Sequence, residues 1–357
     1  MRHSWTSVFL STLVVACGAP EGESGTSGQT EVSGDAGSGL GGDSGDGTIG
    51  EAGGESSGGD AGSGSGGSGE DDSAGSGLDE LDPSVGDMPM DLPPEDLEPQ
   101  PFFFMQLADT QLGFIVDNQH FEMDLALMQS AIDRANLLKP AFVTVCGDMI
   151  NKVMGEAQKD AFWEVADTLD PSIPLYLVAG NHDVDNVPTW KTLSWYWDNF
   201  GDDEYTFEVE GSLFVVLNST LLKEPNGAPV AAAAHKEWLI DTLQSAGEGD
   251  PLHVILLQHH PWTLVAGDEE DQYYNMPSAL RQELFPLFEA AGVRAVFAGH
   301  YHQNAWAMVG PIEHITTAAV GRVFSDEPPG LRIVKVYLDH IEHAYYGHEE
   351  VPDTIEL

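Results

Sequence analysis

Short apolar runs recur between residues 101 and 346, and five of them have the length and continuous apolar character of strands buried on both faces. These predicted strands are Phe102–Leu107, Ala141–Val145, Leu175–Val178, His253–Leu257 and Val293–Phe297. Between them lie segments with apolar residues at helical spacing, which predict helices on the outside of a sheet. The predicted helices are His120–Leu138, Ala157–Leu169, Thr189–Phe200, His235–Gln244 and Ser278–Ala290.

Other apolar runs are typical of antiparallel strands. Tyr205–Glu210 and Leu213–Thr220 lie on either side of Gly211 and predict a hairpin. Ile312–Ala319 and Leu331–Tyr346 predict further antiparallel strands. Together, these elements predict an α/β (α+β) fold with a two-layered sheet core and helices outside.

Each of the five buried strands is followed by residues that can bind metal ions or transfer protons. These residues are Asp109, Asp148, Asn181-His182-Asp183, His259-His260 and His300-Tyr301-His302. One Asp after a strand is usually a turn former or a helix cap, but five such endings in one chain favour a shared site. In open α/β sheets ligands bind beyond the carboxyl ends of the strands, so these side chains are expected to converge. Nitrogen and oxygen ligands without thiolates suit Mn, Fe or Zn, and paired ions are a known device for phosphoryl transfer.

The chain has 59 acidic and 13 basic residues, which gives a formal net charge of −46. This balance argues against a nucleic-acid partner, because nucleic-acid binding needs a basic surface that replaces the phosphate counterions. No apolar run is long enough to cross a bilayer as a helix. The two cysteines exclude a scaffold held by several disulfides, and Cys146, at the end of the apolar run Ala141–Val145, is interpreted as a buried apolar residue.

Residues 18–100 differ in composition from the rest of the chain. They contain 24 of the 40 glycines, 20 acidic residues and no Lys or Arg. Such a segment cannot bury enough apolar surface to offset its chain entropy, so a disordered acidic linker is predicted.

The first 17 residues resemble a bacterial lipoprotein signal. Arg2 precedes a largely apolar run from Val8 to Ala16, and Val14–Cys17 resembles the lipobox at which such signals are cut. The resemblance implies that Cys17 is lipidated and anchors the protein to a membrane of the bacterial cell envelope; an ordinary cleaved signal is the alternative. The predicted organisation is a signal at 1–17, a linker at 18–100, a folded domain at 101–348 and a C-terminal tail at 349–357.

The strand endings, taken in order, resemble the motifs of calcineurin-like metallophosphoesterases. The matching segments are Asp109-Thr110-Gln111, Gly147-Asp148-Met149-Ile150-Asn151, Gly180-Asn181-His182-Asp183, His259-His260-Pro261 and Gly299-His300-Tyr301-His302. Gln111, Phe200–Tyr205 and Leu217-Asn218-Ser219 resemble one subgroup, typified by the calcineurin-like phosphoesterase domain-containing Ser/Thr phosphatase. The resemblance implies an αββα fold, in which a two-layered β-sandwich is flanked by helices.

The same resemblance implies roles around two divalent or trivalent metal ions. The implied ligands are Asp148 shared by both ions, Asp109 and His302 at the first site, and Asn181, His259 and His300 at the second. His182 would protonate the leaving oxygen or stabilise its charge, and Asp183 would orient His182. A hydroxide activated by the metals would attack the phosphorus of a phosphorylated substrate.

Three positions leave the ligand set open. Most of the wider family has His where Gln111 stands, and a neutral amide is a poorer ligand, so a weaker first site or an oxygen ligand is expected there. His259 and His260 compete for one ligand position, and the family's spacing to the following proline favours His259. Asn151 is interpreted as support for the Asp148 loop rather than as a ligand.

The sequence thus predicts a dimetal phosphohydrolase that cleaves phosphomonoesters of proteins or of small organic molecules. A phosphodiesterase with the same centre is the nearest alternative, and a non-catalytic metal-binding surface lipoprotein is another. Turnover that depends on Asp148 would separate the two enzymes from the binding protein.

Overall fold

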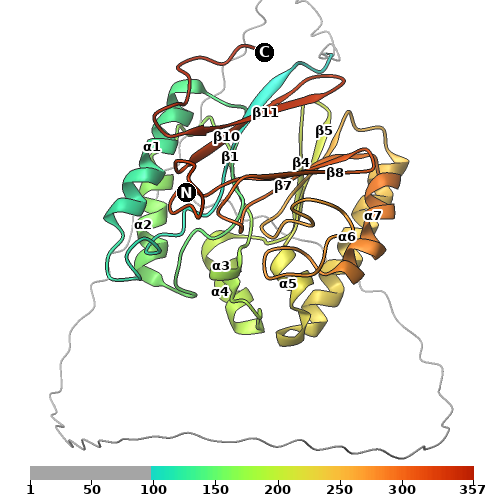
Figure 1. The fold of residues 1–357 in the computed structure, drawn as a ribbon, viewed down its shortest axis with the longest axis horizontal. Coiled ribbons are helices and arrows are strands. Elements are labelled where there is room, and N and C mark those ends of the chain that lie inside the picture. The colour runs from blue at the N-terminus through green and yellow to red at the C-terminus, as the bar shows by residue number, and fades with distance from the viewer. Residues whose placement is uncertain (1–97) are drawn as a thin grey trace, which may run out of the picture. The chain divides into compact units, whose positions relative to one another are not determined.

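The structure is a computed structural model that describes residues 98–357. The predicted signal with Cys17, and the predicted linker apart from its last three residues, lie outside the described residues. Within the described part, the chain forms two β-sheets with helices on their outer faces (Figure 1). No helix in this part has both the length and the apolar character that crossing a membrane requires.

The first sheet has five strands in the order β11-β10-β1-β2-β3. Their bounds are β1 Phe102–Leu107, β2 Val143–Val145, β3 Leu175–Leu177, β10 Gly330–Val336 and β11 Ile341–Gly347. Strand β2 is parallel to both β1 and β3, whereas β10 is antiparallel to β1 and β11 is antiparallel to β10. The three parallel strands therefore direct their carboxyl ends to the same edge of the sheet.

The second sheet has six strands in the order β4-β5-β6-β7-β9-β8. Their bounds are β4 Tyr205–Val209, β5 Ser212–Val216, β6 Val254–Leu257, β7 Val293–Ala298, β8 Ala305–Val309 and β9 Ile312–Thr316. The four central strands are parallel, and the edge strands β4 and β8 are antiparallel to their neighbours. The carboxyl ends of β6 and β7 thus also lie at a common edge.

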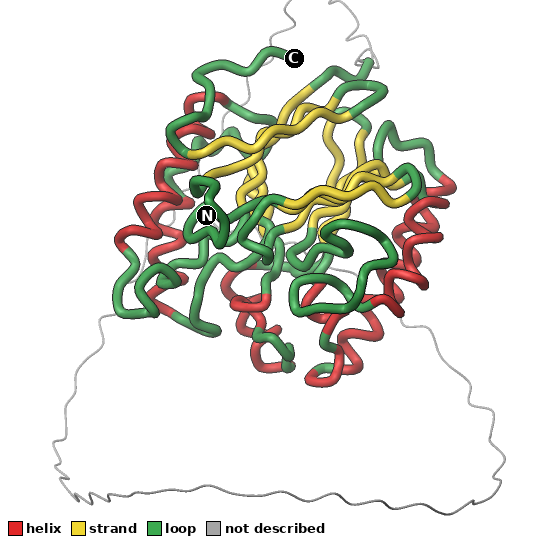
Figure 2. Tube along the Cα trace, in the orientation of Figure 1, coloured by secondary structure: helices red, strands yellow, loops and turns green. Residues whose placement is uncertain are grey.

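Helices cover the outer faces of both sheets, as Figures 1 and 2 show. Helices α1 and α2 pack on the first sheet, and α6 and α7 pack on the second. Short helices α3 and α5 begin just after β3 and β5. The bounds are α1 Glu122–Leu138, α2 Glu156–Ala166, α3 Asn181–Val184, α4 Trp190–Phe200, α5 Ser219–Lys223, α6 Pro229–Glu248 and α7 Ser278–Ala290.

Strand β1 shows why the sheets stack. Phe102 and Phe104 join the core between the two sheets, where both rings contact Phe214 of β5. Phe103 and Met105 lie on the other face of the strand and pack in the core beneath the helices. A strand that is apolar on both faces can be covered on both sides, which explains its continuous apolar run. The predicted two-layered sheet core flanked by helices is confirmed.

The predicted strand Leu213–Thr220 is too long. Strand β5 ends at Val216, and the chain then turns into helix α5. Asn218 caps this helix, because its side-chain oxygen accepts a hydrogen bond from the backbone N–H of Leu221. Such a cap satisfies an amide that has no partner within the helix. The turn places Ser219 beside the strand ends that carry the predicted site.

Helix α6 begins at Pro229 rather than at the predicted His235. Proline is well suited to a first helical turn, where its missing N–H has no partner to lose. His235 is therefore inside the helix, and it is buried. Its Nε2 accepts a hydrogen bond from the backbone N–H of Asn218 at 3.1 Å, and its Nδ1 contacts the Glu204 carboxylate. The buried imidazole thus ties α6 to the start of α5.

Residues 349–357, the predicted tail, contain no helix or strand but lie against the domain. Val351 is buried in the core that α1 shares with the first sheet. Arg134 of α1 also forms an ion pair with Asp353 at 2.9 Å. These residues are therefore part of the folded unit rather than a free end.

Candidate metal centre

The six predicted metal ligands lie together, just beyond the carboxyl ends of β1, β2, β3, β6 and β7. None of these residues is more than 4% exposed. They are Asp109, Asp148, Asn181, His259, His300 and His302. Strand ends from both sheets therefore converge on one buried site, as expected for parallel strands.

Asp148 lies at the middle of this site. Its carboxylate belongs to two groups of three possible ligands, one with His259 and His300 and the other with Asp109 and His302. Within each group the ligand atoms lie within 4.8 Å of one another. Two metal ions bound by these groups would share Asp148.

Asn181 extends the group that contains His259. Its side-chain Oδ1 lies 3.0 Å from His259 Nε2, and Asp148 Oδ2 lies 3.3 Å from the same nitrogen. The amide Nδ2 of Asn181 donates to Asn186 Oδ1 at 3.2 Å. Because the amide nitrogen is held on that side, the oxygen faces the site.

Backbone carbonyls orient two of the histidines. His259 Nδ1 lies 2.8 Å from the carbonyl oxygen of Cys146, and His302 Nδ1 contacts the carbonyl oxygen of Arg322. A carbonyl can only accept, so Nδ1 carries a proton and Nε2 is the nitrogen that can bind a metal once its own proton is lost. Burial also raises the pKa of the Cys146 thiol to about 12. Cys146 is therefore no nucleophile, as its place in an apolar run predicts.

The backbone is strained where the ligands lie. Asp109, Asp148, His300 and His302 have φ values of 51°, 54°, 68° and 53°. Left-handed backbone costs a non-glycine residue about 1–3 kcal/mol, and it persists only where the surrounding structure holds it. Such strain concentrates at functional sites.

Electrostatic interactions keep the central carboxylate ionised. Burial alone would raise the pKa of Asp148, but the imidazoles of His259 and His182 hold it well below its usual range. Burial would likewise lower the pKa of His259, but the carboxylate of Asp148 raises it to about 9. Metals bind the ionised carboxylate, so Asp148 is in its binding form at neutral pH.

Asp183 does not orient His182, which corrects the prediction. Its carboxylate instead accepts backbone hydrogen bonds from Asp148 at 2.8 Å, Met149 at 3.0 Å and Gly180 at 2.9 Å. Burial and the nearby Asp148 carboxylate raise the pKa of Asp183 well above its usual range. Helix α3 turns Asp183 inward, beneath the Asp148 loop, and leaves His182 partly exposed. Asp183 thus fixes the loop that carries the central ligand.

His182 lies at the border between the centre and an open cavity of about 680 Å³. Its backbone N–H donates to Asp148 Oδ1 at 2.8 Å. Its Nδ1 lies 2.7 Å from the carbonyl oxygen of Asn151 and donates to it, because the carbonyl can only accept. The Asn151 carbonyl, rather than Asp183, therefore orients this imidazole.

Gln111 and Asn151 lie on the same side of the centre. Gln111 Nε2 lies 3.4 Å from Asn151 Oδ1, whereas Gln111 Oε1 is buried and has no hydrogen-bond partner among the described residues. Asn151 Nδ2 donates to Asn118 at 2.9 Å, and its backbone N–H donates to Gln158. Asn151 is thus held by hydrogen bonds to Asn118 and Gln158.

His260 belongs to neither ligand group. It is buried, and its Nδ1 lies 3.4 Å from the hydroxyl of Thr220. Sequence reasoning missed Ser219, whose hydroxyl oxygen accepts hydrogen bonds from the backbone N–H groups of His259 and His260 at 3.2 and 2.8 Å. In the sequence, only the Leu217-Asn218-Ser219 motif pointed to a role for Ser219. Because this motif falls within the predicted strand Leu213–Thr220, Ser219 was not placed at the site.

The donors at this site fit a pair of metal ions. Two carboxylates, three imidazoles and an amide oxygen converge with little exposure, and such groups are the usual ligands of Mn, Fe and Zn. The side-chain oxygen of Gln111 is a buried acceptor without a partner among the described residues, and the backbone N–H of Gln111 donates to the carbonyl oxygen of Asp148; a cation would satisfy the side-chain oxygen. The structure therefore contains the ligand set of a two-metal centre.

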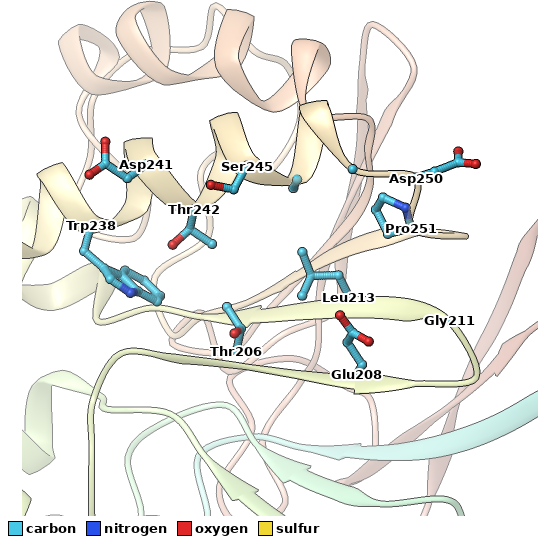
Figure 3. A pocket seen from close by; sticks show the side chains of 12 residues that line it. Thr206, Glu208, Gly211, Leu213, Trp238, Asp241, Thr242, Ser245, Asp250 and Pro251 are labelled. Carbon is cyan, nitrogen blue, oxygen red and sulfur yellow. The ribbon is translucent and has the colours of Figure 1, made fainter. Parts of the chain in front are cut away.

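A second hollow, of about 710 Å³, lies between α6 and the β4–β5 hairpin. Figure 3 shows Trp238 and Thr242 of α6 facing Thr206 of the hairpin. Its lining contains no histidine and none of the predicted site residues. The larger of the two hollows is thus remote from the chemistry, and the ligand geometry rather than the volume locates the site.

Comparison with known proteins agrees with this geometry. The family model described as "Calcineurin-like phosphoesterase" matches residues 104–304. The chain belongs to this family. It is 36% identical over 268 residues to "Serine/threonine-protein phosphatase CPPED1" of Bos taurus. The aligned residues cover 71% of this chain and 86% of the relative. The Danio rerio protein of that name is 35% identical over 268 residues, with 71% and 87% covered.

Solved structures share the fold at low identity. A dimetal phosphatase from Danio rerio has a TM-score of 0.55 at 14% identity, with 70% of this chain and 97% of that chain covered. The purple acid phosphatase PPD1 from yellow lupin has a TM-score of 0.54 at 13% identity, with 70% and 52% covered. These structures support the αββα arrangement. Family membership and the ligand groups together show a metal-dependent phosphoesterase with a dimetal site.

Gly180→Ala is expected to damage the centre while the fold persists. A Cβ at Gly180 would lie 2.2 Å from both the backbone nitrogen and Oδ1 of Asp148, so the central carboxylate must move. Small displacements of catalytic groups can cost about a hundredfold in rate, and a loss of at least about tenfold in turnover is expected here. Bound metal and turnover would be measured together, with a thermal melt to show folding.

Gly249→Ala is the matched control, since the nearest atom to its added Cβ would be 3.4 Å away and the residue lies beyond α6. Its turnover should equal that of the unmodified protein. Full turnover and full metal content in Gly180→Ala would contradict the assignment of Asp148 as the central ligand.

Proposed function

We propose that the protein is a phosphomonoesterase that removes phosphate from phosphoserine or phosphothreonine in proteins. The observation that carries this proposal is the pair of ligand groups that share Asp148 beside an open cavity at His182. The names of the relatives, serine/threonine-protein phosphatases at 35–36% identity, support the choice of substrate.

In this proposal the chain binds two ions of Mn, Fe or Zn. The proposed ligands are Asp148 for both ions, Asp109 and His302 for the first, and Asn181, His259 and His300 for the second. Gln111 Oε1 would be a further oxygen ligand for the first ion. When bound, the ions would polarise the phosphoryl oxygens and lower the pKa of water.

The protein contributes orientation and proton transfer. Because the Asn151 carbonyl accepts the Nδ1 proton of His182, only Nε2 of that imidazole can exchange a proton with a substrate. A protonated Nε2 would donate to the leaving oxygen. This donation would help because a serine or threonine alkoxide is a poor leaving group without a proton. Asp183 holds the Asp148 loop through backbone N–H groups, so the central carboxylate does not need to reorganise during the reaction.

The experiment compares three substrates with the purified chain: a phosphoserine peptide, p-nitrophenyl phosphate and bis(p-nitrophenyl) phosphate. We expect the kcat/KM of both monoesters to exceed that of the diester. Faster turnover of the diester would favour a phosphodiesterase. Bound metal without turnover of any ester would favour a non-catalytic metal-binding protein.

We further propose that Cys17 carries a lipid and holds the enzyme at a membrane of the bacterial cell envelope. The support is the resemblance of Val14–Cys17 to a lipobox. Cys17→Ser is expected to move the protein from the membrane fraction to the soluble fraction of a bacterial host, with its rate on p-nitrophenyl phosphate unchanged. An unaltered membrane fraction would contradict a lipid anchor on this cysteine.

A further inference from the structure

The cavity beside His182 is large compared with a phosphoryl group. Its volume of about 680 Å³ lies in the range of sites that enclose ligands of many atoms, roughly 300–1,000 Å³. Ten described residues line it: Phe114, Ile115, Val116, Asp117, Asn118, Gln119, His120, Asn151, His182 and Arg322. Under the proposed function His182 protonates the leaving oxygen, so this cavity lies on the leaving-group side of the substrate.

Arg322 is fixed at the wall of this cavity. Its guanidinium carbon lies 5.5 Å from the centroid of the Phe114 ring, within the range of a cation–π contact. The Phe114 ring in turn packs at 5.2 Å from the His302 ring and at 6.3 Å from the His182 ring. The carbonyl oxygen of Arg322 also accepts from His302. Both the backbone and the side chain of Arg322 are thus tied to the metal centre.

No acidic side chain among residues 98–357 forms an ion pair with Arg322. Among the described residues, the ion pairs of arginine and lysine involve Arg134, Lys139, Lys159, Lys236 and Arg281, and none involves Arg322. The chain has 59 acidic residues and 13 basic ones, so an unpaired cation beside the centre is notable. Arg322 is the one Arg or Lys among the ten lining residues, and Asp117 is the one carboxylate.

We propose that this cavity binds the residues next to the phosphorylated side chain, and that Arg322 binds an acidic residue there. The ligand is a phosphopeptide in which Asp or Glu flanks the phosphoserine or phosphothreonine. A guanidinium can bind a carboxylate through two parallel hydrogen bonds, whereas the many acidic groups of the protein repel such a peptide elsewhere. Arg322 is thus a specificity-determining residue, and this inference rests on the proposed function.

The test compares two phosphoserine peptides that differ only in flanking residues, Glu in one and Gln in the other. The full chain is assayed at saturating Mn²⁺, and the readout is the ratio of kcat/KM for the two peptides, in which any general loss of activity cancels. We expect the unmodified protein to favour the Glu peptide by roughly tenfold, as for a charge-assisted hydrogen bond in a partly exposed site.

Four variants test whether Arg322 causes the preference for the Glu peptide. In Arg322→Gln the ratio should fall to about one, mainly through a higher KM for the Glu peptide, and Arg322→Lys should restore part of it. Asp117→Asn should raise the ratio, because it removes a like charge from the cavity. Arg294→Gln removes the same charge as Arg322→Gln but lies exposed near the start of β7, whose other end carries the site, and should leave the ratio unchanged.

The outcomes separate this inference from the proposed function. A ratio near one in the unmodified protein, or a preference that survives Arg322→Gln, would overturn the inference while the phosphatase assignment stands. An absence of turnover on both peptides and on p-nitrophenyl phosphate would instead overturn the proposed function. A ratio that falls equally in Arg294→Gln would show an effect of overall charge and would also overturn the inference.

Discussion

Asp148→Asn is expected to remove both metal ions and to lower turnover of p-nitrophenyl phosphate by at least about a thousandfold. The substitution keeps the size of the side chain but removes the charge that both ligand groups share. Metal ions contribute several kcal/mol of transition-state stabilisation, and about 4 kcal/mol corresponds to three orders of magnitude in rate. The measurement is metal content per chain beside the steady-state rate.

Two further variants make this result specific. Asp109→Asn alters only one ligand group, so it should retain about one ion per chain. Asp241→Asn removes a carboxylate from the second hollow, between α6 and the β4–β5 hairpin (Figure 3), and should leave metal content and rate unchanged. If Asp148→Asn, like Asp109→Asn, lost only one ion, Asp148 would not be a ligand of both ions.

His182→Ala is expected to lower kcat by about 10²–10⁴, the range for a lost general acid, while both metal ions stay bound. His182 belongs to neither ligand group, so the centre should remain assembled without its imidazole. The loss should be larger on a phosphoserine peptide than on p-nitrophenyl phosphate, because a serine alkoxide needs a proton more than p-nitrophenolate does. The measurement is kcat on both substrates, with metal content determined on the same samples.

A matched control is His340→Ala, a partly exposed histidine in the turn between β10 and β11. Val336 at the end of β10 pairs with Phe102 at the start of β1, so this turn lies at the opposite end of the sheet from the metal centre. The control should match the unmodified protein. An equal loss on both substrates in His182→Ala would contradict proton donation by this residue.

The gathering of the ligands could be predicted because each strand and its polar ending are adjacent in the sequence. Asp109 follows β1 directly, and His259 follows β6. Parallel strands direct such endings to one edge, so the convergence follows from the strands themselves. The αββα layers could be predicted for the same reason, since strands that are apolar on both faces must be covered on both sides.

Contacts between distant segments could not be predicted in this way. Asp183 is adjacent to His182, yet it hydrogen-bonds the backbone of the Asp148 loop, and His182 turns to the carbonyl of Asn151. Arg322 follows no recognisable motif, and its place beside Phe114 results from the fold alone. Pattern reasoning locates strands and their ends, but it does not show which way a side chain turns once several loops meet.

A phosphoesterase that needs two metal ions should gain activity as ions are returned to metal-free protein, which a titration can follow. Chelator-treated protein would be titrated with Mn²⁺ while bound metal and turnover of p-nitrophenyl phosphate are followed together. We expect negligible turnover without metal and full turnover when two ions are bound per chain. Undiminished turnover in the metal-free protein, or full turnover with a single ion bound, would contradict the need for two ions.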